Sequence, residues 1–299
     1  MKLNLKIIPI LCLLGIFASC EKEVHFNLPR DITEKLVVEG TIENGAPPFV
    51  LLTNSLGFFS KIDLSNLENA FVSGAIVKVS DGSNEITLRE YIIDTVGNKF
   101  MFYTVDSSRP QDFGFLGQVG KTYHLSILSK GKTYEATTTI PQPVEMDSMW
   151  SESYDLTDTE HPEYKKAIVR YTDPPAKGNK YRYYVKQNDK GYLAPRFSTF
   201  NDDVINGTVQ DFDVFNVTNS MDTTTDISAN FFKPGDKVTV KLSAIDSKTF
   251  DFWQTLDFSL GTTGNPFSTP IKVPTNISGG ALGIWAGYAP TYKTIVIQP

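Results

Sequence analysis

The stretch KTYHLSILSKGKTYEATTTI (residues 121–140) carries the pattern that decides the fold class. Tyr123, Leu125 and Ile127 alternate with more polar residues, a Lys-Gly pair interrupts the run, and Tyr134 lies on the return side. Successive side chains of a strand point to opposite faces, so this alternation puts the apolar side chains on one face of a sheet. The stretch therefore predicts a β-hairpin with one buried face.

Segments of the same kind recur along most of the chain. AIVKVSDGSNEITLREY (75–91) alternates in the same way on both sides of an Asp-Gly turn. Other short segments are rich in β-branched and apolar residues, which predicts further strands at residues 35–43, 48–55, 166–173, 180–188, 207–217, 236–246, 281–289 and 292–299. Many short strands joined by glycine- and proline-containing turns are typical of β-sandwiches.

One segment departs from the strand pattern. In SKTFDFWQTLDFSLG (247–261), Phe250, Trp253, Leu256 and Leu260 recur near helical spacing. A polar residue precedes the segment and a glycine ends it, as at many helix termini. We expect the only substantial helix of the chain here, near residues 247–260.

Pro141 and Pro143 mark a boundary within the strand-rich region. Proline has no backbone N–H and cannot donate a hydrogen bond within a sheet. We therefore predict an all-β fold of two β-sandwich domains, residues 35–141 and 142–299, with the short helix in the second domain.

The N-terminus has the parts of an export signal. Two lysines accompany an apolar run (residues 7–17) that is shorter than the ~20 residues needed to span a bilayer. The sequence FASC (17–20) resembles a bacterial lipobox, although leucine is usual at its first position. In lipoproteins with this motif the signal is cleaved before the cysteine, whose thiol and amino group are then acylated. An ordinary secretory signal that ends near a cysteine is the alternative.

The lipobox resemblance implies a signal peptide at residues 1–19, a lipid such as palmitate on Cys20 and a polar tether over residues 20–34. Two acyl chains anchor a protein stably, because each buried methylene contributes about 0.8 kcal/mol. The membrane is thus an expected partner through the N-terminal lipid.

Charge and cysteine content exclude several classes of protein. Removal of residues 1–19 takes away two of the 28 basic residues and none of the 34 acidic ones, so the net charge changes from −6 to −8. An acidic surface does not attract phosphate, which argues against nucleic acid as a partner. Cys12 would leave with the signal and Cys20 would carry lipid, so no disulfide is expected.

Catalytic motifs are absent from the sequence. It contains no G-x-S-x-G, no G-x-x-x-x-G-K-[ST] and no H-E-x-x-H. His25, His124 and His161 are far apart, and His124 is out of phase with its apolar neighbours and is expected to face solvent. The acids of NDDVINGTVQDFD (201–213) do not match a calcium-binding loop. We expect no enzyme activity, no cofactor and no metal site, and an unrecognised hydrolase site is the alternative.

Tyrosines cluster between residues 181 and 192. Tyr183 and Tyr184 are adjacent in a predicted strand and point to opposite faces, so they cannot both face the core. An exposed aromatic ring can stack on a sugar or anchor a protein partner. Tyr183 and Tyr184 are therefore the candidate ligand-binding residues. The alternative is that the outward ring covers a neighbouring strand or the helix.

Four blocks, in order, are distinctive: LVVEGTIENGAPPFVLLTNS (36–55), VSGAIVKVSDG (72–82), GQVGKTYHLSILSKGKTYEATTTIP (117–141) and NPFSTPIKVPTNISGGALGIWAGYA (265–289). Together they resemble Bacteroidota lipoproteins that carry the domain of unknown function 4249, over residues 24–299. The resemblance implies an outer-membrane lipoprotein, often associated with a TonB-dependent receptor system. It also implies a first domain similar to immunoglobulin-like or carboxypeptidase-regulatory-like sandwiches, and no catalytic residues carry over.

The residues after the cysteine bear on the location. Glu21, Lys22 and Glu23 resemble the acidic motif that accompanies transfer of Bacteroidota lipoproteins to the outer leaflet. The resemblance implies exposure at the cell surface, and a merely polar tether is the alternative.

These features predict a lipid-anchored, non-enzymatic binding or accessory lipoprotein of the outer membrane, with a TonB-dependent receptor or another envelope protein as partner. One alternative is a glycan-binding module, suggested by Tyr183 and Tyr184. The other is an adhesin or structural subunit, since a sandwich with unpaired edges can recruit strands.

Overall fold

The computed structural model describes residues 34–55, 69–95, 98–153, 163–204, 206–217, 230–262, 269 and 271–299. The predicted signal peptide, Cys20 and the tether up to residue 33 lie outside these ranges, as do His25 and His161. Glu34–Pro299 forms one compact unit. No helix among the described residues combines the length and the apolar character that a bilayer span requires.

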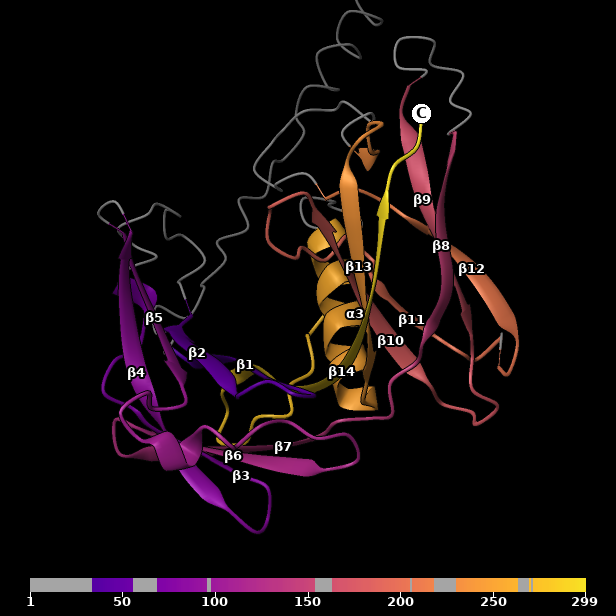
Figure 1. Cartoon of the computed structure of the whole chain (residues 1–299). Helices are drawn as coiled ribbons and strands as arrows, with labels where there is room; N and C mark the ends of the chain where they lie inside the picture. Colours follow the sequence, from indigo (N-terminus) through magenta and orange to yellow (C-terminus); the bar gives the residue numbers. More distant parts are fainter. Residues whose placement is uncertain are drawn as a thin grey trace, which may run out of the picture. The chain divides into compact units, whose positions relative to one another are not determined.

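In the described ranges the strands form an 11-stranded sheet, in the order β11-β10-β13-β14-β1-β2-β5-β4-β3-β6-β7, and a 3-stranded sheet, in the order β12-β9-β8 (Figure 1). The strands of the first half are β1 (Leu36–Glu43), β2 (Phe49–Asn54), β3 (Ile76–Ser80), β4 (Glu85–Thr95), β5 (Asn98–Thr104), β6 (Thr122–Ser129) and β7 (Lys132–Thr139). Those of the second half are β8 (Met146–Ser153), β9 (Lys165–Thr172), β10 (Lys180–Gln187), β11 (Thr199–Asn201), β12 (Val209–Val214), β13 (Lys237–Ile245) and β14 (Leu282–Val296).

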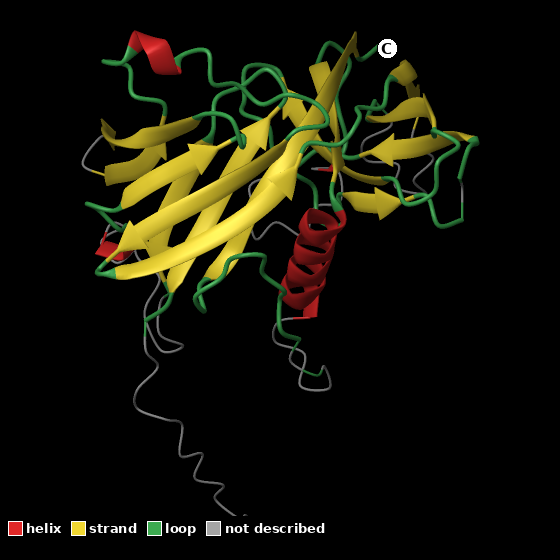
Figure 2. Cartoon of the chain, turned by 90° about the horizontal axis from the view of Figure 1, so that it is seen from below, coloured by secondary structure: helices red, strands yellow, loops and turns green. Residues whose placement is uncertain are grey.

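Strands dominate the described ranges, and α3 (Ser247–Thr262) is the one full α-helix among them (Figure 2). The predicted all-β, sandwich-like fold with a single short helix is confirmed. The helix begins at the predicted residue and ends two residues beyond the predicted end.

The first half of the chain folds into two layers. One layer contains β1, β2 and β5, and the other contains β3, β6 and β7 (Figure 1). β4 belongs to both, because Glu85–Leu88 pairs with β3 and Arg89–Thr95 pairs with β5. Buried residues of both layers, such as Val38 and Leu125, belong to one hydrophobic cluster.

In the second half of the chain, the larger sheet lies between the 3-stranded sheet on one face and α3 on the other. On one face, β10 contacts the small sheet, since the Tyr181 ring lies 5.6 Å from the Tyr171 ring of β9. On the other face, α3 packs on β13 and β14 through a cluster that includes Phe250, Phe252 and Ile284. Most residues of β10 and β13 are therefore covered on both faces.

The predicted domain boundary near residue 141 falls between β7 and β8. Strands from both sides of this boundary hydrogen-bond to each other, because β1 pairs in parallel with β14. The division into sandwich domains at residues 35–141 and 142–299 stays a prediction.

β14 lies in the middle of the larger sheet, between β1 and β13. The prediction of two strands, at 281–289 and 292–299, is wrong, because β14 continues through Pro290. The Tyr288 carbonyl accepts a hydrogen bond from the Asn44 N–H on the β1 side. Backbone groups two residues apart point the same way, so the Pro290 nitrogen faces the side on which β1 has already ended. No hydrogen bond of the sheet is lost there.

Two glycines allow β1 and β14 to pack around Trp285. A Cβ atom on Gly40 would lie 2.6 Å from Cε3 of the Trp285 ring. Gly283 has a φ of +97°, and a Cβ atom there would lie 1.9 Å from the Val38 carbonyl oxygen. The buried indole of Trp285 also donates a hydrogen bond to the Tyr123 carbonyl of β6 (3.1 Å), and so connects the two layers.

The segment before β14 closes the edge of the sheet at β7. The Asn276 side chain acts like a neighbouring strand, because its amide donates to the Trp285 carbonyl (2.7 Å) and its oxygen accepts from the Trp285 N–H (3.0 Å). Ser278 exchanges two hydrogen bonds with the Glu135 backbone of β7, at 2.7 and 2.8 Å. An edge covered in this way is protected from pairing with another chain.

We expect Asn276→Ala to lower the free energy of unfolding by about 2 kcal/mol, because both backbone groups of the buried Trp285 would lose their partner. Urea unfolding followed by tryptophan fluorescence measures the change. Asn84→Ala, in the exposed turn between β3 and β4, is the matched control and should have little effect. Equal midpoints for the two variants would contradict the structural role of Asn276.

Candidate binding surfaces

The structure places the two candidate tyrosines on opposite faces of β10. Tyr183 is buried between the two sheets, with its ring centroid 5.2 Å from that of Phe212. Burial raises the pKa of Tyr183 to about 12. This position suits a core residue and leaves the candidate ligand contact to Tyr184.

Tyr184 lies on the face that carries α3, next to a buried arginine. Arg182 is only 5% exposed, and its guanidinium carbon lies 3.4 Å from the Trp253 ring centroid and 5.0 Å from that of Tyr184. The Trp253 indole donates to the Tyr288 hydroxyl (2.8 Å), which fixes α3 on the sheet. Tyr184 is half-buried and packs edge-on against Tyr288 of β14 at 6.4 Å, across the intervening strand β13.

Beyond the helix, Tyr184, Tyr192 and Tyr292 gather around a charged pair, and we call these three rings the tyrosine platform. Lys241 lies 5.0 Å from the Tyr184 ring and 6.0 Å from the Tyr192 ring, and its amine forms an ion pair with Glu43. The Tyr192 and Tyr292 rings are 6.0 Å apart and are 40% and 54% exposed.

The sequence analysis proposed Tyr184 as a ligand contact and placed Tyr192 only at the end of the tyrosine cluster, and it missed Tyr292, Lys241 and Glu43. These three residues come from β14, β13 and β1, and only the pairing of those strands brings them to the tyrosines. Their alternation within each strand was the one available signal, and it does not indicate which strands are neighbours.

The tyrosines of the platform are neutral at physiological pH. Burial raises the pKa of Tyr184 well above its usual value, and burial together with the charge of Glu43 raises the pKa of Tyr292 to about 12. The same two causes raise the pKa of Tyr192. The platform therefore presents aromatic faces and hydroxyl groups, each of which can donate or accept a hydrogen bond.

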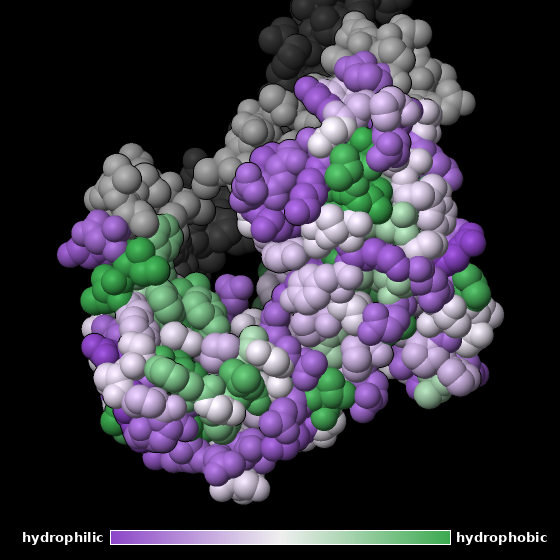
Figure 3. Space-filling view, in the orientation of Figure 1, coloured by the Kyte–Doolittle hydropathy of each residue, from purple (hydrophilic) through white to green (hydrophobic). Residues whose placement is uncertain are grey.

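A second aromatic surface lies on β2, β4 and β5. The Phe102 ring stacks at 5.1 Å on Phe49 and at 5.7 Å on Tyr91, and the Phe100 ring is 51% exposed on the same face of β5. We call Phe49, Tyr91, Phe100 and Phe102 the β5 aromatic face. Figure 3 shows apolar surface over the region where Figure 1 places β4 and β5.

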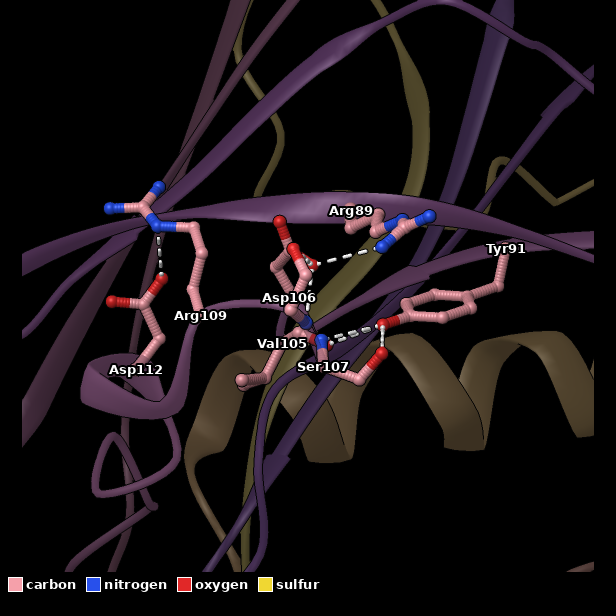
Figure 4. A network of polar contacts seen from close by, with 8 residues as sticks. Arg89, Tyr91, Val105, Asp106, Ser107, Arg109 and Asp112 are labelled. Atoms are coloured by element: carbon pink, nitrogen blue, oxygen red, sulfur yellow. Dashed lines mark hydrogen bonds and ion pairs between the residues drawn. The ribbon is translucent and has the colours of Figure 1, made fainter.

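A polar network holds one margin of the β5 aromatic face (Figure 4). The Ser107 N–H donates to the Tyr91 hydroxyl (2.7 Å), which itself lies 2.9 Å from Ser107 Oγ and 3.2 Å from the Val105 carbonyl. Arg89 pairs with Asp106 at 3.2 Å and lies 5.5 Å from the Tyr91 ring. Hydrogen bonds thus hold Tyr91 at its hydroxyl, and Arg89 lies over its ring, which reduces the entropy lost when a partner binds.

Strand register puts both surfaces on one face of the larger sheet. Across the sheet, Tyr184 is opposite Lys241, and Lys241 is opposite Tyr292. On the other side of β14, Tyr288 is opposite Glu43, which shares a face of β1 with Thr41 two residues earlier, and Thr41 is opposite Phe49. Residues that oppose each other share a face. The platform, α3 and the β5 aromatic face therefore occupy the same face of the sheet.

The remaining polar candidates have local partners. His124 is exposed, as the alternation predicted, and lies 3.4 Å from Thr137 Oγ1. Asp211 pairs with Arg170 (2.7 Å), and Asp213 pairs with Lys166 (3.0 Å). Among the residues that the structure describes, no three or more His, Cys, Asp or Glu side chains form a group that could hold a metal ion.

Comparison with known proteins identifies one family. The chain matches the domain of unknown function DUF4249 over residues 21–294, which includes all four distinctive blocks. No curated protein matches the sequence. Because the match covers most of the chain, this protein belongs to the DUF4249 family.

Proposed function

We propose that this chain is a lipid-anchored, non-enzymatic binding or accessory lipoprotein of the Bacteroidota outer membrane, exposed at the cell surface. The lipobox-like FASC (17–20) supports lipid attachment at Cys20, and Glu21 and Glu23 support the surface location. The resemblance of the four sequence blocks to Bacteroidota lipoproteins supports an envelope partner, such as a TonB-dependent receptor.

The β5 aromatic face is the observation that carries the binding role. Aromatic residues are enriched in the cores of protein interfaces, where a few of them contribute most of the binding energy. Here the Phe49, Phe102 and Tyr91 rings are stacked in a row, and Phe100 extends the exposed apolar surface. Contiguous exposed apolar patches often mark sites of interaction with a protein or a membrane. Recognition through this face requires no catalytic group.

The lipid anchor is tested by Cys20→Ala in cells that express the full chain. We expect this variant to lose labelling by radioactive palmitate and to leave the membrane fraction, because the acyl chains provide the attachment. Cys12→Ala lies inside the predicted signal and is the matched control, which should keep both properties. Persistent labelling of the Cys20→Ala protein would refute lipidation at this residue.

The partner is tested by placing a photo-crosslinking residue at position 100 and irradiating native membranes. We expect a defined envelope protein to crosslink from position 100 and not from position 209, where Val209 is similarly exposed on β12. Phe100→Ser should reduce co-purification of that protein about tenfold, as loss of an interface anchor worth about 1.4 kcal/mol would. Crosslinking that is equal from both positions, or absent from both, would count against the β5 aromatic face.

Glycan binding is the second candidate function, and the tyrosine platform favours it. Two exposed tyrosine rings beside an ion pair offer stacking faces and hydrogen-bonding groups to a sugar.

A glycan array probed with the full mature protein tests this second candidate. We expect Tyr192→Ala and Tyr292→Ala each to reduce the retained signal about tenfold, because each removes an exposed stacking ring. Phe113→Ala removes a similarly exposed ring elsewhere and should leave the signal unchanged. If the parent protein binds nothing on the array, the glycan hypothesis fails.

A further inference from the structure

A cavity of about 710 Å³ lies between the segment that follows β10, the segment that follows β12, and the C-terminal half of α3. Its apolar walls include Leu193, Phe215 and Leu260, and its polar groups include Arg196, Asn216 and Asp257. Its volume is in the range of small-molecule sites, which combine apolar walls with a few polar groups that orient the ligand.

Asp257 brings a carboxylate to the wall of the cavity. The backbone N–H groups of Phe197 and Ser198 bond to its carboxylate, whereas Oδ2 is buried and has no hydrogen-bond partner. Burial raises the pKa of Asp257, and the charges of Arg182 and Arg196 oppose this effect. Oδ2 has too little accessible surface to receive a ligand directly. A carboxylate has about four acceptor sites, of which the two N–H groups use two, so a ligand hydroxyl in the cavity can donate to the oxygen that they bond.

The polar groups of the cavity differ in whether they donate or accept hydrogen bonds. The Asp257 carboxylate accepts and the Arg196 guanidinium donates. The Asn216 amide already donates to the Gln187 side chain and the Phe231 carbonyl (3.4 Å each), so its oxygen is the group left to accept. A sugar hydroxyl also donates and accepts, and the C–H face of a sugar ring can lie on an apolar wall. A polyhydroxy ring can therefore donate to Asp257 and to the Asn216 oxygen while it accepts from Arg196.

The charged groups at the cavity narrow the class of ligand further. Arg196 lines the cavity, and the buried guanidinium of Arg182 acts on Asp257 from beneath α3. Two arginines against one carboxylate leave a positive balance, which opposes a cationic ligand. Neutral or acidic sugars should thus bind in preference to amino sugars.

We infer that this cavity binds a sugar ring of a neutral or acidic glycan, with Asp257 accepting a hydroxyl hydrogen bond and Arg196 donating to a ring substituent. This inference rests on the second proposed function, glycan binding. Tyr192 of the platform directly precedes Leu193 of the cavity, so one loop contributes to both. A longer glycan would contact the platform with its next ring.

Saturation-transfer NMR and titration with D-glucose, D-galacturonate and D-glucosamine test the cavity in the full mature protein. We expect galacturonate to bind more tightly than glucose because of the two arginines, glucosamine to bind more weakly than glucose, and Asp257→Asn to weaken glucose binding about tenfold. Asp251→Asn is the matched control, because Asp251 is exposed on the same helix. Arg196→Gln replaces an exposed side chain and should abolish the preference for galacturonate over glucose.

The possible results distinguish failure of the cavity assignment from failure of glycan binding, the proposed function on which that assignment rests. If array glycans bind and the tyrosine variants lose them, but Asp257→Asn and Arg196→Gln bind all three sugars like the parent, the cavity assignment is overturned and glycan binding stands. Tighter binding of glucosamine than of glucose would also overturn it. If neither the array nor the three sugars bind, both proposals fail. If sugar binding is changed in Asp257→Asn and Arg196→Gln but not in Asp251→Asn, the result supports the cavity assignment.

Discussion

The pairing of β14 with β1 is the contact on which the rest of the structure depends. The two strands come from opposite ends of the described chain, and they pair in parallel over seven residue pairs. β14 also pairs with β13, so a single strand joins the layers of the first half to those of the second. This pairing is possible because Gly40 leaves room for the buried Trp285 ring and Gly283 for the Val38 carbonyl.

The same pairing explains why the candidate binding surfaces lie where they do. One face of the larger sheet is covered by the other strand layers, and the opposite face is covered by α3 only in part. The indole of Trp253, between Arg182 and Tyr288, fixes the helix over one end of that face. The uncovered parts carry the tyrosine platform and the β5 aromatic face, where exposed rings are available to a partner.

Local patterns were sufficient for the hairpins and the helix. The alternation on either side of a glycine turn predicted the β3–β4 and β6–β7 hairpins, because both strands and their turn lie within about twenty residues. β5, β8 and β11 were not predicted. β8 (MDSMWSES) has no regular alternation of apolar residues, and β11 has only three residues, so each becomes a strand because a neighbouring strand offers hydrogen bonds. The split of β14 into two predicted strands on either side of Pro290 has a related reason. Whether a proline interrupts a strand depends on which neighbouring strand faces its nitrogen.

For the candidate sites, the residue types alone identified a tyrosine-rich strand and the opposite orientation of Tyr183 and Tyr184. Side-chain alternation within a strand is local, and therefore the all-β class, the hairpins and the single helix could be read from the amino acids. The choice of which tyrosine is buried, the meeting of Lys241 with Glu43, and the cavity beside Asp257 depend on the tertiary structure. They require strand neighbours and register, which are set by contacts between residues far apart in the chain.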